Sequence, residues 1–245
     1  VIGSTLGDCI FGDNFNNTLE GGNGNDTLEG AGGADSLDGG DGIDTASYAT
    51  SPSGVIVTLS SVTNTGSDAQ GDTLTNIEHV IGSAGTDTIT GDSVNNSISG
   101  GDEADSLLGA GGADTILGEA GSDTLTGGTG NDEISGGAGT DRIDSDAGAD
   151  TIDGGTEYDV LVYSGDAVTV NLQTNTNTGG DALGDSIVGI EEVIGTNNAD
   201  NLTADNSGMV LRGSTTLAGA DGNDTLTGGS GNDTLFGGVA GADSI

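Results

Sequence analysis

Basic side chains are almost missing from this sequence. Its 245 residues contain 40 aspartates and glutamates against two arginines, Arg142 and Arg212, and no lysine, which gives a formal net charge of −38. Proteins that bind nucleic acids contact the phosphates through Lys and Arg, so this function class is excluded. Like charges at this density also oppose a compact state. Composition alone therefore predicts disorder, unless cations supply the missing counter-charge.

Other absences narrow the class of protein further. Cys9 is the single cysteine, so the chain forms no internal disulfide and offers no thiol pair to a metal. Pro52 is the single proline beside 50 glycines, which excludes a collagen helix. No apolar run reaches the length of about 18 residues that a transmembrane helix needs. The first residues show no signal-peptide pattern.

A nine-residue repeat fills the middle of the chain, over residues 82–162. Nine consecutive frames follow one another without a slip, and each has Ile or Leu at its eighth position. Eight of the nine frames have Asp at the sixth position and eight have Gly at the first; the exceptions are Asn96 and Ser145. A register held at three positions is typical of a solenoid rather than of a low-complexity sequence.

The repeat divides the chain into five segments. Nonads fill residues 1–47, 82–162 and, in degenerate form, 195–245, whereas residues 48–81 and 163–194 interrupt the period. The two interruptions match each other: each has alternating apolar residues that predict a strand, followed by GDTLTNIEHVIG or GDSIVGIEEVIG. The frames are cut at both ends, which predicts that the chain is a segment of a longer array.

Each nonad combines a tight turn with a short strand. Gly, Asn and Asp at positions 1 to 6 accept positive φ angles and form turns. Positions 7 to 9 have strand propensity, and the eighth side chain points inward while its neighbours point to solvent. Two nonads then make one coil, and coils stack about 4.8 Å apart, so residues two nonads apart become neighbours. We expect an all-β fold, a right-handed parallel β-roll with two longer strand-containing interruptions.

Such stacking places the sixth-position acids in two columns, one along each edge of the roll. Carboxylates about 4.8 Å apart repel by several kcal/mol at an effective dielectric of about 20. A cation between successive turns would remove this cost. Carboxylate and backbone carbonyl oxygens, with no His or Cys among them, favour Ca²⁺ over transition metals and over Mg²⁺.

Three frames carry a resemblance to a known family. They are GGNGNDTLE, GGTGNDEIS and GGSGNDTLF, and they resemble the hemolysin-type (RTX) calcium-binding nonapeptide GGxGxDxUx. The interruptions are similar to an element common in this family, so the resemblance covers essentially the whole chain. It implies a β-roll with multiple Ca²⁺ ions in its turns, export by a type I secretion apparatus and calcium-triggered folding outside the cell. The expected localisation is therefore secreted and extracellular.

The expected metal ligands are the sixth-position aspartates of the frames. They are Asp8, Asp26, Asp35, Asp44, Asp87, Asp105, Asp114, Asp123, Asp132, Asp141, Asp150, Asp159, Asp200, Asp224 and Asp233. Some frames depart from the family pattern: Asn17 and Asn96 supply no charge, and Glu103 and Glu157 replace the fourth-position glycine. Met209 replaces the sixth-position acid of its frame.

We expect no catalytic site within this segment. Chemistry on uronates needs cationic groups and a positioned base, and a hydrolase triad needs a histidine with an orienting acid and a nucleophile. Two isolated arginines and the single histidine, His79, supply neither. Two alternatives to a secretion and folding module stay open. One is the structural rod of a calcium-stiffened surface adhesin or surface-layer protein. The other is an accessory module of a secreted polysaccharide-modifying enzyme or protease, with a polysaccharide or a cell surface as a partner.

Overall fold

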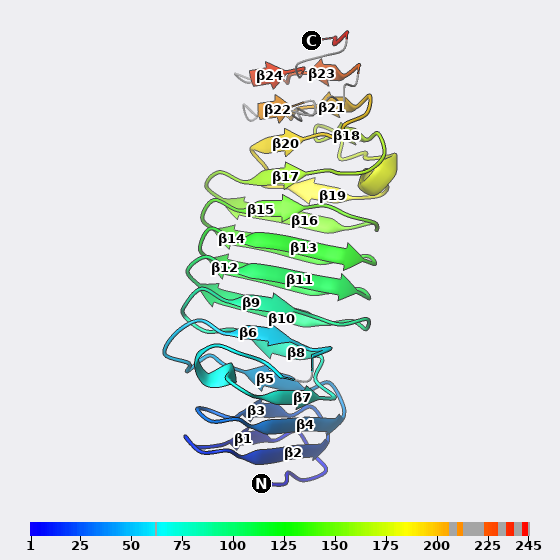
Figure 1. Ribbon diagram of the computed structural model, residues 1–245. Coiled ribbons are helices and arrows are strands. Elements are labelled where there is room, and N and C mark those ends of the chain that lie inside the picture. The colour runs from blue at the N-terminus through cyan, green and yellow to red at the C-terminus, as the bar shows by residue number, and fades with distance from the viewer. Residues whose placement is uncertain (62, 206–209, 213–222, 230–233, 238–241, 245) are drawn as a thin grey trace.

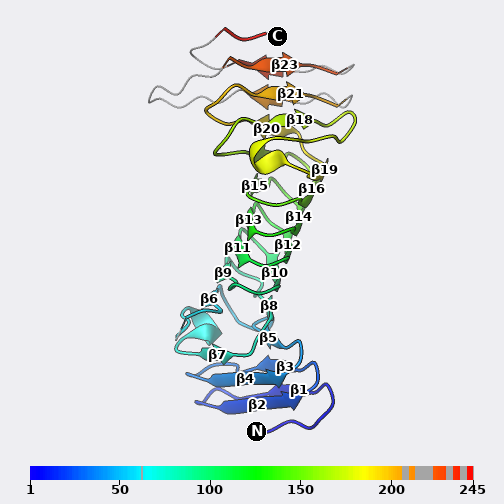
Figure 2. The same cartoon turned by 90° about the vertical axis from the view of Figure 1, so that its right-hand side faces the viewer.

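The protein is an elongated stack of coils. The computed structural model describes residues 1–61, 63–205, 210–212, 223–229, 234–237 and 242–244. The first coils lie at one end of the stack and the last strands at the other (Figure 1). In the view turned by 90°, the central coils appear narrow, with strands on two opposite faces, whereas the coils at either end appear broad (Figure 2).

Two long parallel sheets form the two faces of this stack, and each has nine strands. The first contains, in spatial order, β1 (Cys9–Phe11), β3 (Thr27–Glu29), β5 (Thr45–Ser47), β8 (His79–Ile81), β10 (Ser97–Asp102), β12 (Thr115–Ala120), β14 (Glu133–Ala138), β16 (Thr151–Thr156) and β19 (Ser186–Val188). The second contains β6 (Ile56–Thr58), β9 (Thr88–Thr90), β11 (Ser106–Gly111), β13 (Thr124–Thr129), β15 (Arg142–Asp144), β17 (Val160–Val162), β20 (Glu192–Ile194), β22 (Val210–Arg212) and β24 (Thr234–Phe236).

Two sheets of three strands complete the faces at the ends of the stack. The first contains β2 (Thr18–Asn23), β4 (Ser36–Asp41) and β7 (Thr73–Thr75), and the second contains β18 (Thr169–Asn171), β21 (Asn201–Thr203) and β23 (Thr225–Thr227). Neither of the two described helices, the 3₁₀ turns η1 (Ser67–Ala69) and η2 (Gly180–Ala182), is long and apolar enough to cross a membrane.

The strand register is the one that the nonads predict. Ile98 on β10 pairs with Ile116 on β12, and Leu107 on β11 pairs with Leu125 on β13, all in parallel. Residues two nonads apart are therefore spatial neighbours, and the expected parallel β-roll is confirmed. The reason is local. Every second frame repeats a turn of the same length and a strand at the same three positions, so equivalent backbone groups pair in each new coil.

The core is a ladder of aliphatic side chains between the two faces. All nine eighth-position residues of the central run are at most 2% exposed, and they are Ile89, Ile98, Leu107, Ile116, Leu125, Ile134, Ile143, Ile152 and Leu161. Their sequence neighbours at positions 7 and 9 are exposed or half-buried, as the alternation of β13 shows. One large side chain per strand fills the space because turns of small residues keep the two sheets close.

The interruptions are lengthened coils that stay in the stack. The backbone N–H of Asp44 reaches a carboxylate 34 residues ahead, on Glu78, whereas the equivalent bond from Asp26 spans 18 residues. The extra chain of the first interruption forms β6, η1 and β7, and its Val55 and Val57 side chains are fully buried. The second interruption repeats this arrangement with β18, η2 and β19. Both thus extend the core rather than loop away from it.

Shortening one rung of the aliphatic ladder should destabilise the folded roll locally. We expect Ile116→Ala to lower the free energy of unfolding by about 2–5 kcal/mol, because Ile116 is fully buried and each coil contacts only its neighbours. Urea unfolding followed by circular dichroism measures this. Leu117→Ala is the matched control, since Leu117 is partly exposed on the outer face. Equal effects of the two changes would contradict the assignment of the core.

Candidate metal centre

The turns align the sixth-position residues in two columns, held by one repeated hydrogen bond. The Oδ1 atom of each acid accepts the backbone N–H of the sixth-position residue one coil earlier, as from Asp105 to Asp123 at 2.8 Å and from Asp114 to Asp132 at 2.7 Å. One column runs through Asp8, Asp26, Asp44, Glu78, Asn96, Asp114, Asp132, Asp150 and Asp185. The bond differs at one step of it, where the side-chain amide of Asn96 donates to the backbone carbonyl of Glu78 at 3.2 Å. The central part of the other runs through Asp87, Asp105, Asp123, Asp141, Asp159 and Glu191.

The second carboxylate oxygen of most of these acids is buried without a hydrogen-bond partner. This holds for the Oδ2 atoms of Asp26, Asp35, Asp44, Asp105, Asp114, Asp123, Asp132, Asp141, Asp150 and Asp159. Each of these ten side chains is at most 4% exposed. A buried ionised oxygen without a partner costs several kcal/mol. A row of such atoms therefore marks positions where a positive charge would be stabilised.

Backbone oxygens face the same positions. A Cβ atom on Gly118 would collide with Oδ2 of Asp123 and with the carbonyl oxygen of Gly136 in the next coil. Gly109 has the same two neighbours in its own turn, an Asp Oδ2 and a carbonyl oxygen. The first-position glycine thus leaves room for oxygen atoms from two coils to approach each other. In the described part of the chain, no three His, Cys, Asp or Glu side chains could hold a metal ion by themselves.

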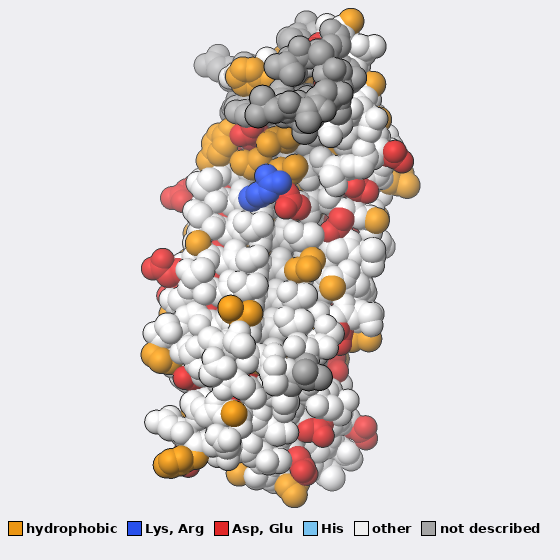
Figure 3. Space-filling model, viewed as in Figure 1, with side chains coloured by type: hydrophobic (Ala, Val, Ile, Leu, Met, Phe, Trp, Pro, Cys, Tyr) orange, Lys and Arg blue, Asp and Glu red, His pale blue; other side chains and the backbone are white. Residues whose placement is uncertain are grey.

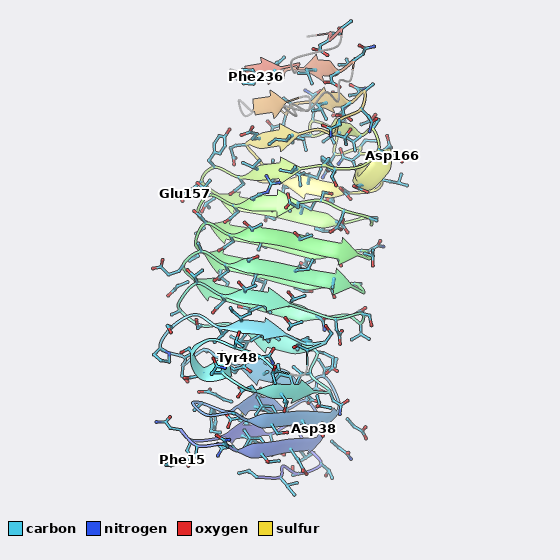
Figure 4. The ribbon with its side chains drawn as sticks, viewed as in Figure 1. Phe15, Asp38, Tyr48, Glu157, Asp166 and Phe236 are labelled. Atoms are coloured by element: carbon cyan, nitrogen blue, oxygen red, sulfur yellow. The ribbon has the colours of Figure 1, made fainter. Side chains whose placement is uncertain are left out.

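The turns depend on two left-handed positions. The second and fourth residues of the Gly127 frame, Gly128 and Gly130, have φ angles of 102° and 144°. Glu103 and Glu157 adopt the same region at the fourth position, with φ of 66° and 87°, although they carry a side chain. Non-glycine residues pay roughly 1–2 kcal/mol for this conformation. The stack imposes the left-handed conformation on Glu103 and Glu157, because their turns stay in register with the neighbouring coils. Figure 4 labels Glu157 at the edge of the roll.

Burial raises the pKa of the column carboxyls. The pKa of Asp105 rises to about 7, and those of Asp114, Asp123 and Asp159 rise to about 6. Loss of hydration is the largest cause in each case, and the N–H bond to Oδ1 partly opposes it. Neighbouring acids raise these pKa values further, as Asp87 does for Asp105. Figure 3 shows most acidic side chains toward the two edges of the face.

Three predicted ligands have their second oxygen already bonded to the protein. The N–H groups of Ser4, Ser83 and Thr196 donate to Oδ2 of their own frame's aspartate at 2.6, 2.6 and 2.7 Å. Those aspartates are Asp8, Asp87 and Asp200. Asp224 is 3% exposed and accepts the N–H of Asp200 at 3.0 Å. Asp233 and Met209 lie outside the described residues.

The frame at Ser145 brings an additional acid to its column. Asp146, at the second position, accepts the N–H of Gly128 at 2.5 Å through Oδ2, and its Oδ1 is buried without a partner. Burial, together with the nearby Asp150 and Asp132, raises its pKa to about 7. Asp146 lies outside the sixth position, so the nonad pattern does not predict it as a ligand.

Tyrosines satisfy the second oxygen at the interruptions. The hydroxyl of Tyr48 donates to Oδ2 of Asp72 at 3.1 Å, and the hydroxyl of Tyr163 donates to Oδ2 of Asp185 at 3.1 Å. All four side chains are buried. Loss of hydration raises the pKa of both tyrosines, so each hydroxyl keeps its proton and stays a donor. Figure 4 shows Tyr48 beside the first interruption.

Four acids of the two interruptions also belong to the columns, and the nine-residue period does not predict them. Glu78 accepts the N–H of Asp44 at 2.9 Å and Glu191 accepts that of Asp159 at 2.9 Å, each in the place of a sixth-position Asp. Asp72 and Asp185 act in the same way for the frames before them. The signal for all four is the recurrence of Gly-Asp and Ile-Glu at matching places in both interruptions.

A family pattern matches along the chain. The family is described as an RTX calcium-binding nonapeptide repeat (4 copies), and its pattern matches residues 11–46, 76–93, 81–116, 90–125, 117–152, 126–161 and 211–245, which together cover more than half of the sequence. The chain belongs to this RTX family. Its recognition from three frames is thereby confirmed. The RTX module is a calcium-binding repeat unit, not a catalytic one. No curated protein matches the chain.

Relieving a strained turn should stabilise the RTX module. We expect Glu103→Gly to raise the free energy of unfolding in saturating calcium by up to about 1 kcal/mol, because glycine adopts the φ of 66° without a Cβ clash. Glu103→Gln removes the charge but keeps the strained side chain, so we expect a smaller change. Urea midpoints compare the three proteins. If both variants gain equally, charge rather than backbone conformation is responsible.

The metal-free RTX module should be more folded in acid than at neutral pH. A raised folded-state pKa means that the folded chain binds protons more tightly than the unfolded chain. The resulting stabilisation is complete below the unfolded pKa of about 4 and is lost as the pH rises through about 6 to 7. In solutions stripped of divalent cations, the β signal in circular dichroism should grow from pH 8 to pH 5. A constant signal, or growth toward pH 8, would contradict this.

Proposed function

We propose that this chain is the calcium-binding repeat module of a secreted bacterial protein, and that it folds when it meets Ca²⁺ outside the cell. The main support for this proposal is the set of buried Oδ2 atoms without a hydrogen-bond partner, which recur at the same place in successive coils. A net charge of −38 with two basic residues means that the chain cannot supply its own counter-charge. Its folded state therefore requires ions from the solution.

The proposed ligands are the aspartates whose second oxygen lacks a partner. They are Asp26, Asp35, Asp44, Asp105, Asp114, Asp123, Asp132, Asp141, Asp150 and Asp159. Ca²⁺ takes six to eight oxygen ligands, more than these carboxylates provide, and tolerates irregular geometry. Backbone carbonyls such as that of Gly136, beside Oδ2 of Asp123, would complete the set. This donor set has neither nitrogen nor sulfur, which fits Ca²⁺ better than a transition metal.

The two oxygens of each carboxylate have different roles. Oδ1 of Asp123 holds the N–H of Asp105 at 2.8 Å and so fixes the distance between coils. Oδ2 of Asp123 is buried beside glycine backbone without a partner, where a cation would bind it. When bound, Ca²⁺ supplies the positive charge that lets superposed acidic turns coexist. Because the turn exists only in the folded stack, ion binding and folding are one equilibrium.

This coupling explains a secretion role for the module. A chain that needs calcium stays unfolded where the free ion is scarce, and extracellular calcium modules typically bind in the range of about 10⁻⁴ to 10⁻³ M. An unfolded, acidic chain suits passage through a type I secretion apparatus. Folding after export would then follow from the calcium concentration outside. We propose on this ground that the protein is extracellular.

Calcium should convert the chain from unfolded to β at neutral pH. We expect circular dichroism in EGTA to lack the β signal and added Ca²⁺ to restore it. Asp132→Asn should raise the calcium concentration at the midpoint by about 3- to 10-fold, roughly 1 kcal/mol, because Asn keeps the bond to Asp114 but supplies no charge at Oδ2. Glu133→Gln removes a charge from the exposed neighbour and is the matched control.

Two outcomes would count against this function. The first is an unchanged β spectrum in EGTA. The second is an equal midpoint shift for Asp132→Asn and Glu133→Gln, which would show that net charge alone matters and that the buried oxygens bind nothing.

A further inference from the structure

Two turns of this chain differ at one residue and have different hydrogen bonds. Residues 82–87 read GSAGTD and residues 136–141 read GGAGTD, so Ser83 and Gly137 are the only difference. Both turns lie in the same column of the roll. Oδ2 of Asp87 accepts an N–H from Ser83 at 2.6 Å, whereas Oδ2 of Asp141 is buried without a partner. The second residue of the frame decides this difference.

Ser83 closes its turn with three hydrogen bonds. Its N–H donates to Oδ2 of Asp87, its hydroxyl donates to Oδ1 of Asp87 at 2.9 Å, and its Oγ accepts the N–H of Gly85 at 3.0 Å. Gly137 instead has a φ of 107°, in the left-handed region, and its N–H does not donate to Asp141. Both oxygens of Asp87 are therefore satisfied by the protein, and one oxygen of Asp141 is not.

The same division holds along the described chain. We call a turn self-capped when the N–H of its second residue donates to the sixth-position side chain. Five turns are of this kind, with donor-to-acceptor distances between 2.6 and 2.8 Å, and their second residues are Ser4, Asp13, Ser83, Asp92 and Thr196. In each, the second residue's side-chain oxygen also accepts the N–H two residues ahead. Only Ser, Thr and Asp occur there, because this local bond needs a short side chain with an acceptor oxygen.

Open turns are those whose second residue has a positive φ. Their second residues are Gly22, Ala31, Gly40, Gly101, Ala110, Glu119, Gly128, Gly137 and Gly155. The sixth-position aspartate of every one of these nine turns has its Oδ2 buried without a partner. The turn at Ser145 belongs to neither group, because Asp146 has no positive φ and Asp150 still lacks a partner at Oδ2.

We infer that the second residue of each nonad decides whether its turn binds calcium or caps itself. This inference rests on the proposed function of the open turns. The N–H group of the second residue supplies a partial positive charge at the side-chain oxygen of the sixth residue, in the place where a cation would bind, so the self-capped turns take no ion. They hold Asp8, Asn17, Asp87, Asn96 and Asp200. Three of these residues match the family's acidic position, and by this rule they are not ligands.

Three of the five self-capped turns follow an interruption. The frames at Gly82 and Gly91 follow the first interruption, and the frame at Gly195 follows the second. The coil after the first interruption is thus completed by protein donors alone. The N–H of Asp87 is then bonded by the first open turn, through Asp105 at 2.7 Å. The central calcium-dependent run therefore begins on a coil that needs no ion.

Exchanging the second residues of the matched pair tests this inference. Ser83→Gly makes its turn identical to the open turn at Gly136, so the full chain should bind about one additional Ca²⁺ in saturating calcium. Gly137→Ser should bind about one fewer, because a Cβ there collides with the carbonyl of Glu119 and favours the self-capped form. Native mass spectrometry or equilibrium dialysis with the metal alone counts the ions. Ser93→Gly, at an exposed third position, is the control and should leave the count unchanged.

The ion counts distinguish a failure of this inference from a failure of the proposed function. If wild type binds several Ca²⁺ and Ser83→Gly binds no more, the inference is overturned while the proposed function stands. If wild type binds none, the proposed function itself fails. Should Gly137→Ser not fold, Ser83→Gly alone decides, because it removes a side chain and introduces no new steric conflict.

Discussion

In each open turn, a buried carboxylate has one oxygen bonded to the preceding coil and a second oxygen that is buried without a hydrogen-bond partner. The first bond, between Oδ1 of Asp123 and the N–H of Asp105, sets the register of the stack. The second oxygen, left without a donor, sets its chemistry. The hydrogen bond at Oδ1 and the unpartnered Oδ2 occur together, because both oxygens belong to the same side chain. The fold is thus tied to a positive charge that the chain lacks.

The tight stacking that creates this need also determines the composition. A first-position glycine is required where Oδ2 and a carbonyl of the next coil approach its Cα, as at Gly118. Turns this small leave room for one aliphatic side chain per strand, so the core is thin. A thin core cannot offset repulsion at a net charge of −38. We propose on this ground that bound cations are part of the folded structure.

The chain satisfies the second oxygen in three different ways. In the open turns, we propose that Ca²⁺ does so. In the self-capped turns, the N–H of Ser83 or its equivalents takes this place. At the interruptions, a buried tyrosine hydroxyl donates to Asp72 or Asp185. All three place positive charge at the same point of the coil, which is why coils of different length and composition share one stack. On the proposal made above, calcium binding is thereby confined to the runs of open turns.

The sequence by itself determined the period, the aliphatic ladder and the two columns of acids. These follow from frames that repeat without a slip, since strand alternation fixes which side of each residue is buried, and Ile98 must then lie beneath Ile116. The partner of each second oxygen was decided only by the tertiary structure. Asp87 and Asp141 occupy equivalent positions and look alike as ligands, yet one φ angle at the second residue separates them. Likewise Glu78 and Tyr48 meet the columns only because a lengthened coil returns to register, and a period of nine contains no information about that return.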